Sequence, residues 1–146
     1  MTTVAVPTAG RRSLVARAGL GLVAAGNAEV GIWGTVSPRS FFDNYPGFGH
    51  HWVSELGQYN EHLVRDYCAA EIGFAVLLAI AAWLFTRTVV LVAGAGFLAG
   101  TLPHFAYHLT TTESFKTADN VASLGAFALE MAVVFAVMLF TCRRET

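Results

Sequence analysis

Charged residues are scarce in this chain of 146 residues, where Asp, Glu, Lys and Arg together make up only 13%. Soluble domains carry about 25% of such residues, so this chain lacks the polar atoms that would cover a soluble surface. Nine basic residues against ten acidic ones leave no positive excess, which argues against a nucleic-acid binder. With 55% hydrophobic residues and a mean hydropathy of +0.54, the composition indicates an integral membrane protein.

Cysteine is scarce as well, because the chain contains only Cys68 and Cys142. We expect these two residues near opposite faces of the membrane, too far apart to form a disulfide. The sequence also has no glycine-rich phosphate loop at a strand–helix turn and no serine nucleophile elbow. These absences argue against a disulfide scaffold, a nucleotide-binding protein and a serine hydrolase.

Long apolar runs are what the chain has instead. A bilayer core about 30 Å thick needs roughly 20 residues of helix. Four segments meet this length, at about residues 14–36, 62–85, 89–109 and 121–141. Because an open sheet edge or a bare loop cannot sit in hydrocarbon, the sequence predicts an all-α integral membrane four-helix bundle. We expect a single four-span domain over residues 1–146, with an aromatic-rich outer loop.

The basic residues predict the orientation, since positive charge gathers on the cytoplasmic side of a membrane protein. In a topology with an even number of spans, six arginines fall on one side: Arg11, Arg12, Arg17, Arg87, Arg143 and Arg144. The other side has only Arg39, Arg65 and Lys116. We therefore expect both termini in the cytoplasm, both longer loops outside, and a multi-pass protein of the inner (plasma) membrane.

Ionisable side chains inside a membrane are costly and need a partner or a purpose. Three pairs stand four residues apart and so share a helix face: Glu61 with Arg65, His62 with Asp66, and His104 with His108. At a rise of about 1.5 Å per residue, the second and third spans place them at matching depths in the outer half. If the two faces meet, all six side chains line one polar cavity.

Three imidazoles and a carboxylate form a set that suits a transition metal. The candidate metal ligands are therefore His62, Asp66, His104 and His108. A haem held by one histidine from each helix is an alternative. The candidate catalytic residues are Glu61, Arg65, Asp66 and Glu71, with Arg65 holding an anionic or carbonyl oxygen and Glu71 acting as an acid. A metal-free site and a purely structural polar network are the other interpretations of the same residues.

Three carboxylates are expected deeper in the membrane, at Glu29, Glu71 and Glu130. Burial favours the neutral form of an unpaired carboxyl group, which can then donate or pass a proton. These residues support one further hypothesis, a proton-coupled small transporter that acts as an oligomer. A neutral glutamate that only hydrogen-bonds a neighbouring helix is the structural alternative.

The first outer loop, residues 37–59, is rich in aromatic residues and interrupted by proline and glycine. We expect a short surface helix over residues 51–59, with Trp52, Val53 and Leu56 turned inward. Such a loop is either a lid over the polar cavity or an anchor at the membrane interface.

Glycines in the spans predict close helix packing, because small residues let helix backbones approach each other in lipid. The pattern does not separate packing within one chain from contacts in a homo-dimer. The glycines concerned are Gly19, Gly26, Gly31 and Gly34 in the first span, and the pair Gly96 and Gly100 in the third.

Several motifs follow one another in a recognisable order between about Gly31 and Glu130. They are Trp33-Gly34, Tyr45-Pro46-Gly47, Tyr59-Asn60-Glu61-His62 with Arg65-Asp66, and Pro103-His104 with His108. This pattern resembles small actinobacterial membrane proteins that are similar to the DoxX-like class of four-helix proteins. Some DoxX-like proteins are associated with quinone-linked sulfur oxidation or oxidative-stress complexes, so the resemblance implies a four-helix fold and a redox association. It transfers no catalytic residue to this chain.

Together these observations predict a membrane protein that binds a small lipophilic molecule, such as a quinone or a lipid, with or without a metal or haem. The alternatives are a non-enzymatic accessory or structural subunit of a membrane complex and the proton-coupled transporter. The expected partners are the lipid bilayer, the quinone or lipid ligand, and either a second copy of the chain or a membrane complex. Whether the protein is an enzyme stays open at this point.

Overall fold

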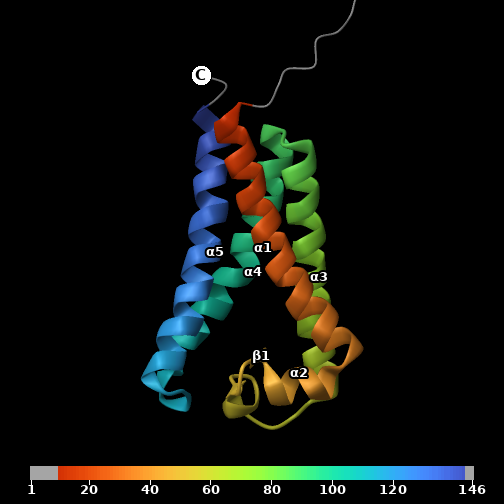
Figure 1. The fold of residues 1–146 in the computed structure, drawn as a ribbon, viewed down its shortest axis with the longest axis vertical. Coiled ribbons are helices and arrows are strands. Elements are labelled where there is room, and N and C mark those ends of the chain that lie inside the picture. Colours follow the sequence, from red (N-terminus) through yellow and green to blue (C-terminus); the bar gives the residue numbers. More distant parts are fainter. Residues whose placement is uncertain (1–9, 144–146) are drawn as a thin grey trace, which may run out of the picture.

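The computed structural model describes residues 10–143 and is almost entirely helical (Figure 1). Its long helices are α1 (Arg11–Val36), α3 (Glu61–Leu84), α4 (Arg87–Thr110) and α5 (Thr117–Arg143). Each coincides with one of the four apolar segments expected from the sequence. The short elements are α2 (Pro38–Asn44), β1 (Pro46–Gly47), β2 (His50–His51) and the 3-10 turns η1 (Ser54–Leu56) and η2 (Thr112–Ser114). Arg144, expected to mark the cytoplasmic side, lies outside the described residues.

Within residues 10–143, three helices are long and apolar enough to cross a membrane: α3, α4 and α5. They indicate a membrane protein and confirm the class expected from composition. Helix α1 has the necessary length but does not reach the same apolarity. Asn27, Glu29 and several glycines interrupt its hydrophobic residues, so its sequence is less apolar than that of the other three helices.

The four long helices lie side by side in the order α1, α3, α4, α5, with α5 returning to contact α1. Helix α1 packs along the length of α3, and this is the most extensive contact between two helices. Figure 1 shows the start of α1 and the end of α5 at the same end of the molecule. Toward the opposite end the helices spread apart, and α2 and the β1–β2 hairpin lie between them.

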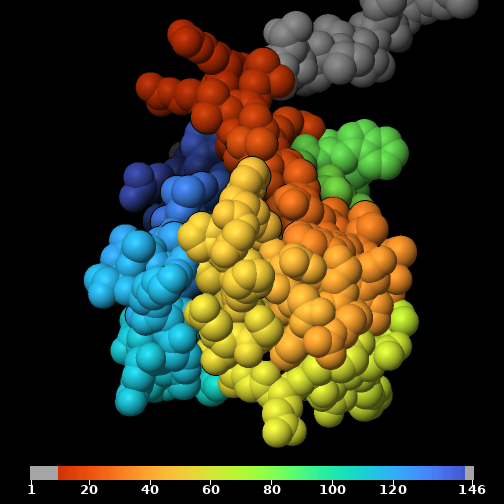
Figure 2. Space-filling model, turned by 60° about the horizontal axis from the view of Figure 1, so that its bottom comes forward, coloured from red at the N-terminus to blue at the C-terminus, as the bar shows by residue number. Residues whose placement is uncertain are grey.

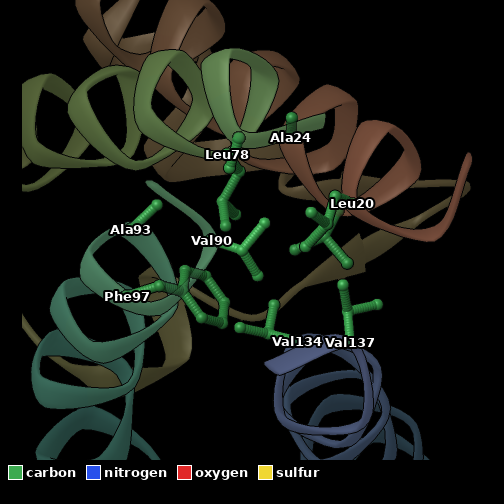
Figure 3. Close-up of a cluster of buried hydrophobic side chains, with 10 residues drawn as sticks. Leu20, Ala24, Leu78, Val90, Ala93, Phe97, Val134 and Val137 are labelled. Carbon is green, nitrogen blue, oxygen red and sulfur yellow. The ribbon is translucent and has the colours of Figure 1, made fainter. Parts of the chain in front are cut away.

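A dry apolar core holds the helices together at the end where the described chain begins and finishes. Figure 3 shows its side chains converging from all four long helices. Leu20 of α1, Leu78 of α3, Phe97 of α4 and Val134 of α5 are each at most 1% exposed. Because such a core excludes water and lipid, it fixes the relative positions of the helices at this end.

The turn from α3 to α4 is tight and is held by a side chain of α1. Phe85 takes a left-handed conformation at the end of α3, with φ 51°. Arg17 donates hydrogen bonds to the carbonyl oxygens of Ala82 (2.9 Å) and Trp83 (2.5 Å) and lies 4.8 Å from the centroid of the Phe85 ring. A cation at a helix C-terminus complements the helix dipole and satisfies orphan carbonyls. Arg17, expected only as a marker of orientation, therefore also joins α1 to α3.

Loop 37–59 folds differently from the expectation. Its α-helix is α2, which begins at Pro38. In the segment 51–59, where a surface helix was expected, the only helical element is the short 3-10 turn η1. Proline is favoured in the first turn of a helix because its missing N–H would be unpaired there. The β1–β2 hairpin then turns through Gly47 and Gly49, whose φ values of 97° and 83° favour glycine.

Glycine allows α1 and α3 to approach closely, as expected for Gly31 and Gly34. A Cβ atom at Gly31 would lie 2.8 Å from both the carbonyl oxygen of Cys68 and the backbone nitrogen of Ile72. A Cβ atom at Gly34 would overlap the Cys68 sulfur. The expected Gly96–Gly100 pair is only half realised, since Gly100 contacts the Phe74 ring while a Cβ at Gly96 would meet open space.

Gly31→Ala tests this close approach. The added methyl group would press on backbone atoms of α3, which cannot rotate away, so we expect a loss of about 1–3 kcal/mol in stability. At about 2–4 °C per kcal/mol, this loss appears as a lower Tm of the purified protein. Gly125→Ala on α5 is the matched control, because nothing lies within 4 Å of its Cβ position. Equal Tm values for the two variants would contradict the assigned contact.

Candidate functional site

A cavity of about 680 Å³ lies between the four long helices at the end where they spread apart. Its walls come from α1, α3, α4 and α5, and loop 37–59 covers it. Figure 2, which views this end, shows the loop in orange and yellow filling the space between α5 and the start of α3. The volume falls within the range of about 300–1,000 Å³ that small-molecule sites occupy.

The cavity wall is mostly apolar and is rich in aromatic rings. Six aromatic side chains of the loop and its surroundings show this character: Phe41, Phe42, Tyr45, Trp52, Phe115 and Phe127. The inward direction expected for Trp52, Val53 and Leu56 is confirmed, because all three line the cavity. Loop 37–59 therefore forms part of the cavity wall.

A hydrogen-bonded junction attaches loop 37–59 to the start of α5. Asp119 accepts a hydrogen bond from the indole nitrogen of Trp52 (2.9 Å), and its Oδ1 lies 2.7 Å from Nδ1 of His50. Neither contact was expected from the sequence, because the partners are 67 and 69 positions apart. An aspartate at the start of a long helix was visible, but its partners in the loop were not.

Tyr45 occupies the centre of the aromatic cluster in the loop. Its ring lies 4.9 Å from Phe41, 6.1 Å from Trp52 and 6.2 Å from Trp33, measured between centroids. Burial raises the pKa of Tyr45 to about 12, and the carboxylate of Glu130 adds to this shift. The hydroxyl group therefore stays protonated and keeps its ability to donate a hydrogen bond at neutral pH.

Of the candidate catalytic residues, only Glu71 lines the cavity. Glu61, Arg65 and Asp66 do not line it, which corrects the expected placement. On α3 the cavity face runs through Val64, Tyr67 and Glu71, at helical spacing. The charged pairs lie on other faces of the same helix. Spacing of four shows that two residues share a face, but it does not show which neighbour that face meets.

The Glu61–Arg65 pair joins two helix ends. Nε of Arg65 lies 2.9 Å from the Glu61 carboxylate, and the same guanidinium donates a hydrogen bond to the carbonyl oxygen of Thr35 near the end of α1. A positive group at the C-terminus of α1 complements its dipole. The geometry supports a structural role for Arg65 in holding α1 against α3.

The four candidate metal ligands form two separate pairs. His62 and Asp66 lie 3.3 Å apart on α3, with side chains 87% and 63% exposed. His104 and His108 lie on α4 with their Nε2 atoms 3.0 Å apart, and both line the cavity. Within the part of the chain that the structure describes, no three His, Cys, Asp or Glu side chains are grouped so that they could hold a metal ion. Of these four candidate ligands, only His104 and His108 line the cavity.

The histidine pair is packed among aromatic rings. The imidazole of His104 stacks on Tyr67 of α3, with centroids 5.2 Å apart and planes at 21°. His108 stacks on Phe115, at 6.1 Å and 15°. Phe127 of α5 lies 5.0 Å from His104 and 5.3 Å from His108. These contacts orient both rings at the cavity wall.

Two of the three deep carboxylates face the cavity, and the third does not. Glu71 is hydrogen-bonded by the hydroxyl group of Tyr67, and Glu130 by the side-chain amide of Asn27. Glu29 is exposed on α1 and does not line the cavity. The sequence had suggested Glu71 and Glu130, but it missed the hydrogen-bond donors. For Tyr67, a spacing of four from Glu71 was the available signal.

Asp119→Ala tests how firmly the loop is attached. The substitution removes the acceptor for Trp52 and His50, and hydrogen bonds contribute about 0.5–1.5 kcal/mol each. We expect amide hydrogen exchange at Trp52, whose N–H bonds to the carbonyl oxygen of Tyr45 (2.9 Å), to become about tenfold faster. Asp43→Ala is the control in the same loop, since its pair with Arg39 is exposed and such pairs contribute little. Unchanged exchange in Asp119→Ala would show that the junction does not hold the loop.

Comparison with known proteins adds no further information on the site. The chain matches no family model, no curated protein and no solved structure. The resemblance to the DoxX-like class is therefore not tested and stays a prediction. The function must be argued from the geometry of the cavity itself.

Proposed function

We propose that the protein is an inner-membrane protein in which α1 also crosses the bilayer, so that four helices span it. Helix α1 has 26 residues and would measure about 39 Å, and it packs along α3, which is itself apolar enough to span. The start of α1, the α3–α4 turn and the end of α5 lie together (Figure 1), and they carry Arg11, Arg12, Arg87 and Arg143. This clustering supports a cytoplasmic position for that end.

The function that the geometry supports best is binding of a small lipophilic molecule, such as a quinone or a lipid, in the cavity. The observation that carries this proposal is the cavity itself: about 680 Å³ of space, mostly apolar walls and a few polar groups at defined positions. Sites of this kind bind ligands by burying apolar surface, while the few polar groups orient the ligand. Loop 37–59 covers the outer end in this arrangement.

A cavity-filling substitution tests the proposal. Ala126 of α5 lines the cavity, whereas Ala128, two residues further along, does not. Ala126→Phe places a ring in the binding space, and we expect the affinity for a lipophilic ligand to fall by at least about tenfold, or about 1.4 kcal/mol. Ala128→Phe adds the same ring outside the cavity and should bind like the parent protein.

The readout is saturable quenching of Trp52 fluorescence in phosphatidylcholine nanodiscs. Trp52 lines the cavity, so Trp33 and Trp83 are replaced by phenylalanine and a Tm measurement confirms folding. The quenchers are a short-chain quinone analogue, a brominated fatty alcohol and a brominated alkylamine. Saturable quenching by any of them that is lost in Ala126→Phe supports the proposal. Quenching that never saturates contradicts the proposal, and so does quenching that is equal in Ala126→Phe and Ala128→Phe.

A further inference from the structure

The groups that line the cavity have an unusual charge balance. The cavity wall carries the carboxyl groups of Glu71 and Glu130 and the imidazoles of His104 and His108. Among the lining residues, all of which fall within residues 10–143, there is no lysine and no arginine. The wall therefore offers carboxyl groups and ring nitrogens that can accept hydrogen bonds, and it carries no lysine or arginine side chain.

The arginines nearest to the loop end are engaged elsewhere. Arg39 pairs with Asp43 at 2.7 Å and lies over the Tyr59 ring at 5.0 Å, and neither Arg39 nor Asp43 lines the cavity. Arg65 pairs with Glu61 and with the carbonyl oxygen of Thr35. These two arginines are thus paired outside the cavity.

The two carboxyl groups receive hydrogen bonds only from neutral donors in the described contacts. Tyr67 donates to Glu71, and Asn27 donates to Glu130 and also to the carbonyl oxygen of Val23 (2.9 Å). A carboxyl group has two oxygens and about four acceptor positions, so one such bond leaves capacity for a ligand. Both carboxyl groups line the same cavity, so a positive group between them would interact favourably with both.

Aromatic ring faces complete the environment. Trp52 and Phe115 lie 6.5 Å apart between centroids, and the rings of Tyr67 and Phe127 lie 5.2 and 5.0 Å from that of His104. The face of an aromatic ring is electron-rich and attracts cations, more strongly where water is excluded. The same rings present apolar surface to the rest of a lipophilic molecule.

We propose that the ligand of the cavity is a lipophilic amine: a positively charged ammonium head that lies between Glu71 and Glu130, joined to an apolar part that lies against the aromatic wall. This inference rests on the proposed function and names its ligand class. It excludes lipids with an anionic head, because no basic side chain in the wall would neutralise them. It also disfavours an oxidised quinone, whose carbonyl oxygens only accept hydrogen bonds.

The experiment compares three probes that carry the same brominated alkyl chain and end in an amine, an alcohol or a carboxylic acid. Binding is measured by saturable quenching of Trp52 in phosphatidylcholine nanodiscs and corrected for partition into empty nanodiscs. We expect the amine to bind at least about tenfold more tightly than the alcohol, since a charge-assisted hydrogen bond is stronger than a neutral one. The acid should bind most weakly.

Variants locate the effect in the cavity. Glu71→Gln and Glu130→Gln should each weaken amine binding by about tenfold while changing alcohol binding by less than about threefold. Glu29→Gln is the matched control, because its carboxyl group is on α1 but outside the cavity. The comparison of three probes on the parent protein keeps the inference testable if one glutamine variant does not fold.

The two proposals fail in different ways. If the alcohol or the acid binds as tightly as the amine and Ala126→Phe removes that binding, the cavity is a ligand site but the inference of an amine is wrong. If amine binding is unchanged by both Glu71→Gln and Glu130→Gln, the inference is wrong as well. If none of the three probes shows saturable binding, the inference of an amine is wrong. If the quinone analogue also shows no saturable binding, the proposed function itself is contradicted.

Discussion

The arrangement of the helices depends on how closely α1 can approach α3. The contact at Gly31 leaves no room for a Cβ atom, since one would lie 2.8 Å from backbone atoms of Cys68 and Ile72. Against α5 the spacing is looser, with Cβ positions of Gly19 and Gly26 at 3.1 Å from Val133 and 3.6 Å from Glu130. Because α1 is held to α3 near the loop, it can diverge from α5 there. The space between them becomes a cavity instead of a dry core.

This geometry gives the two ends of the molecule different chemistry. At the end where the described chain begins and finishes, side chains such as Leu20, Leu78 and Val134 meet directly and fill the interior. At the other end, the helices are too far apart to do so, and loop 37–59 supplies Phe41, Phe42 and Trp52 instead. A loop that replaces core packing needs its own attachment, which Asp119 provides. The site is therefore bounded by a rigid apolar core and by a segment held through few polar contacts.

The sequence predicted the helices well but not the direction of their faces. Apolar length alone located α1, α3, α4 and α5, because a helix is the economical way to satisfy a backbone in lipid. A spacing of four correctly paired Glu61 with Arg65 and His104 with His108. It could not say that His104 turns toward Tyr67 while His62 turns outward, since rotation about a helix axis is set by neighbours. The contacts of Asp119 with the loop could not be predicted either, because they join residues that are far apart in the chain.

The distribution of charge distinguishes the carboxyl groups in the cavity from the charged pairs outside it. Outside the cavity, the two acidic candidates each have a partner on their own helix: Glu61 pairs with Arg65, and Asp66 pairs with His62. Glu71 and Glu130 instead face a shared space and are held by the neutral donors Tyr67 and Asn27. A buried carboxyl group avoids the cost of an unmatched charge by staying neutral, and a cation beside it favours the ionised form. Tyr67 and Asn27 hold the two carboxyl groups in place, and the ammonium head of the inferred ligand would supply the counter-charge.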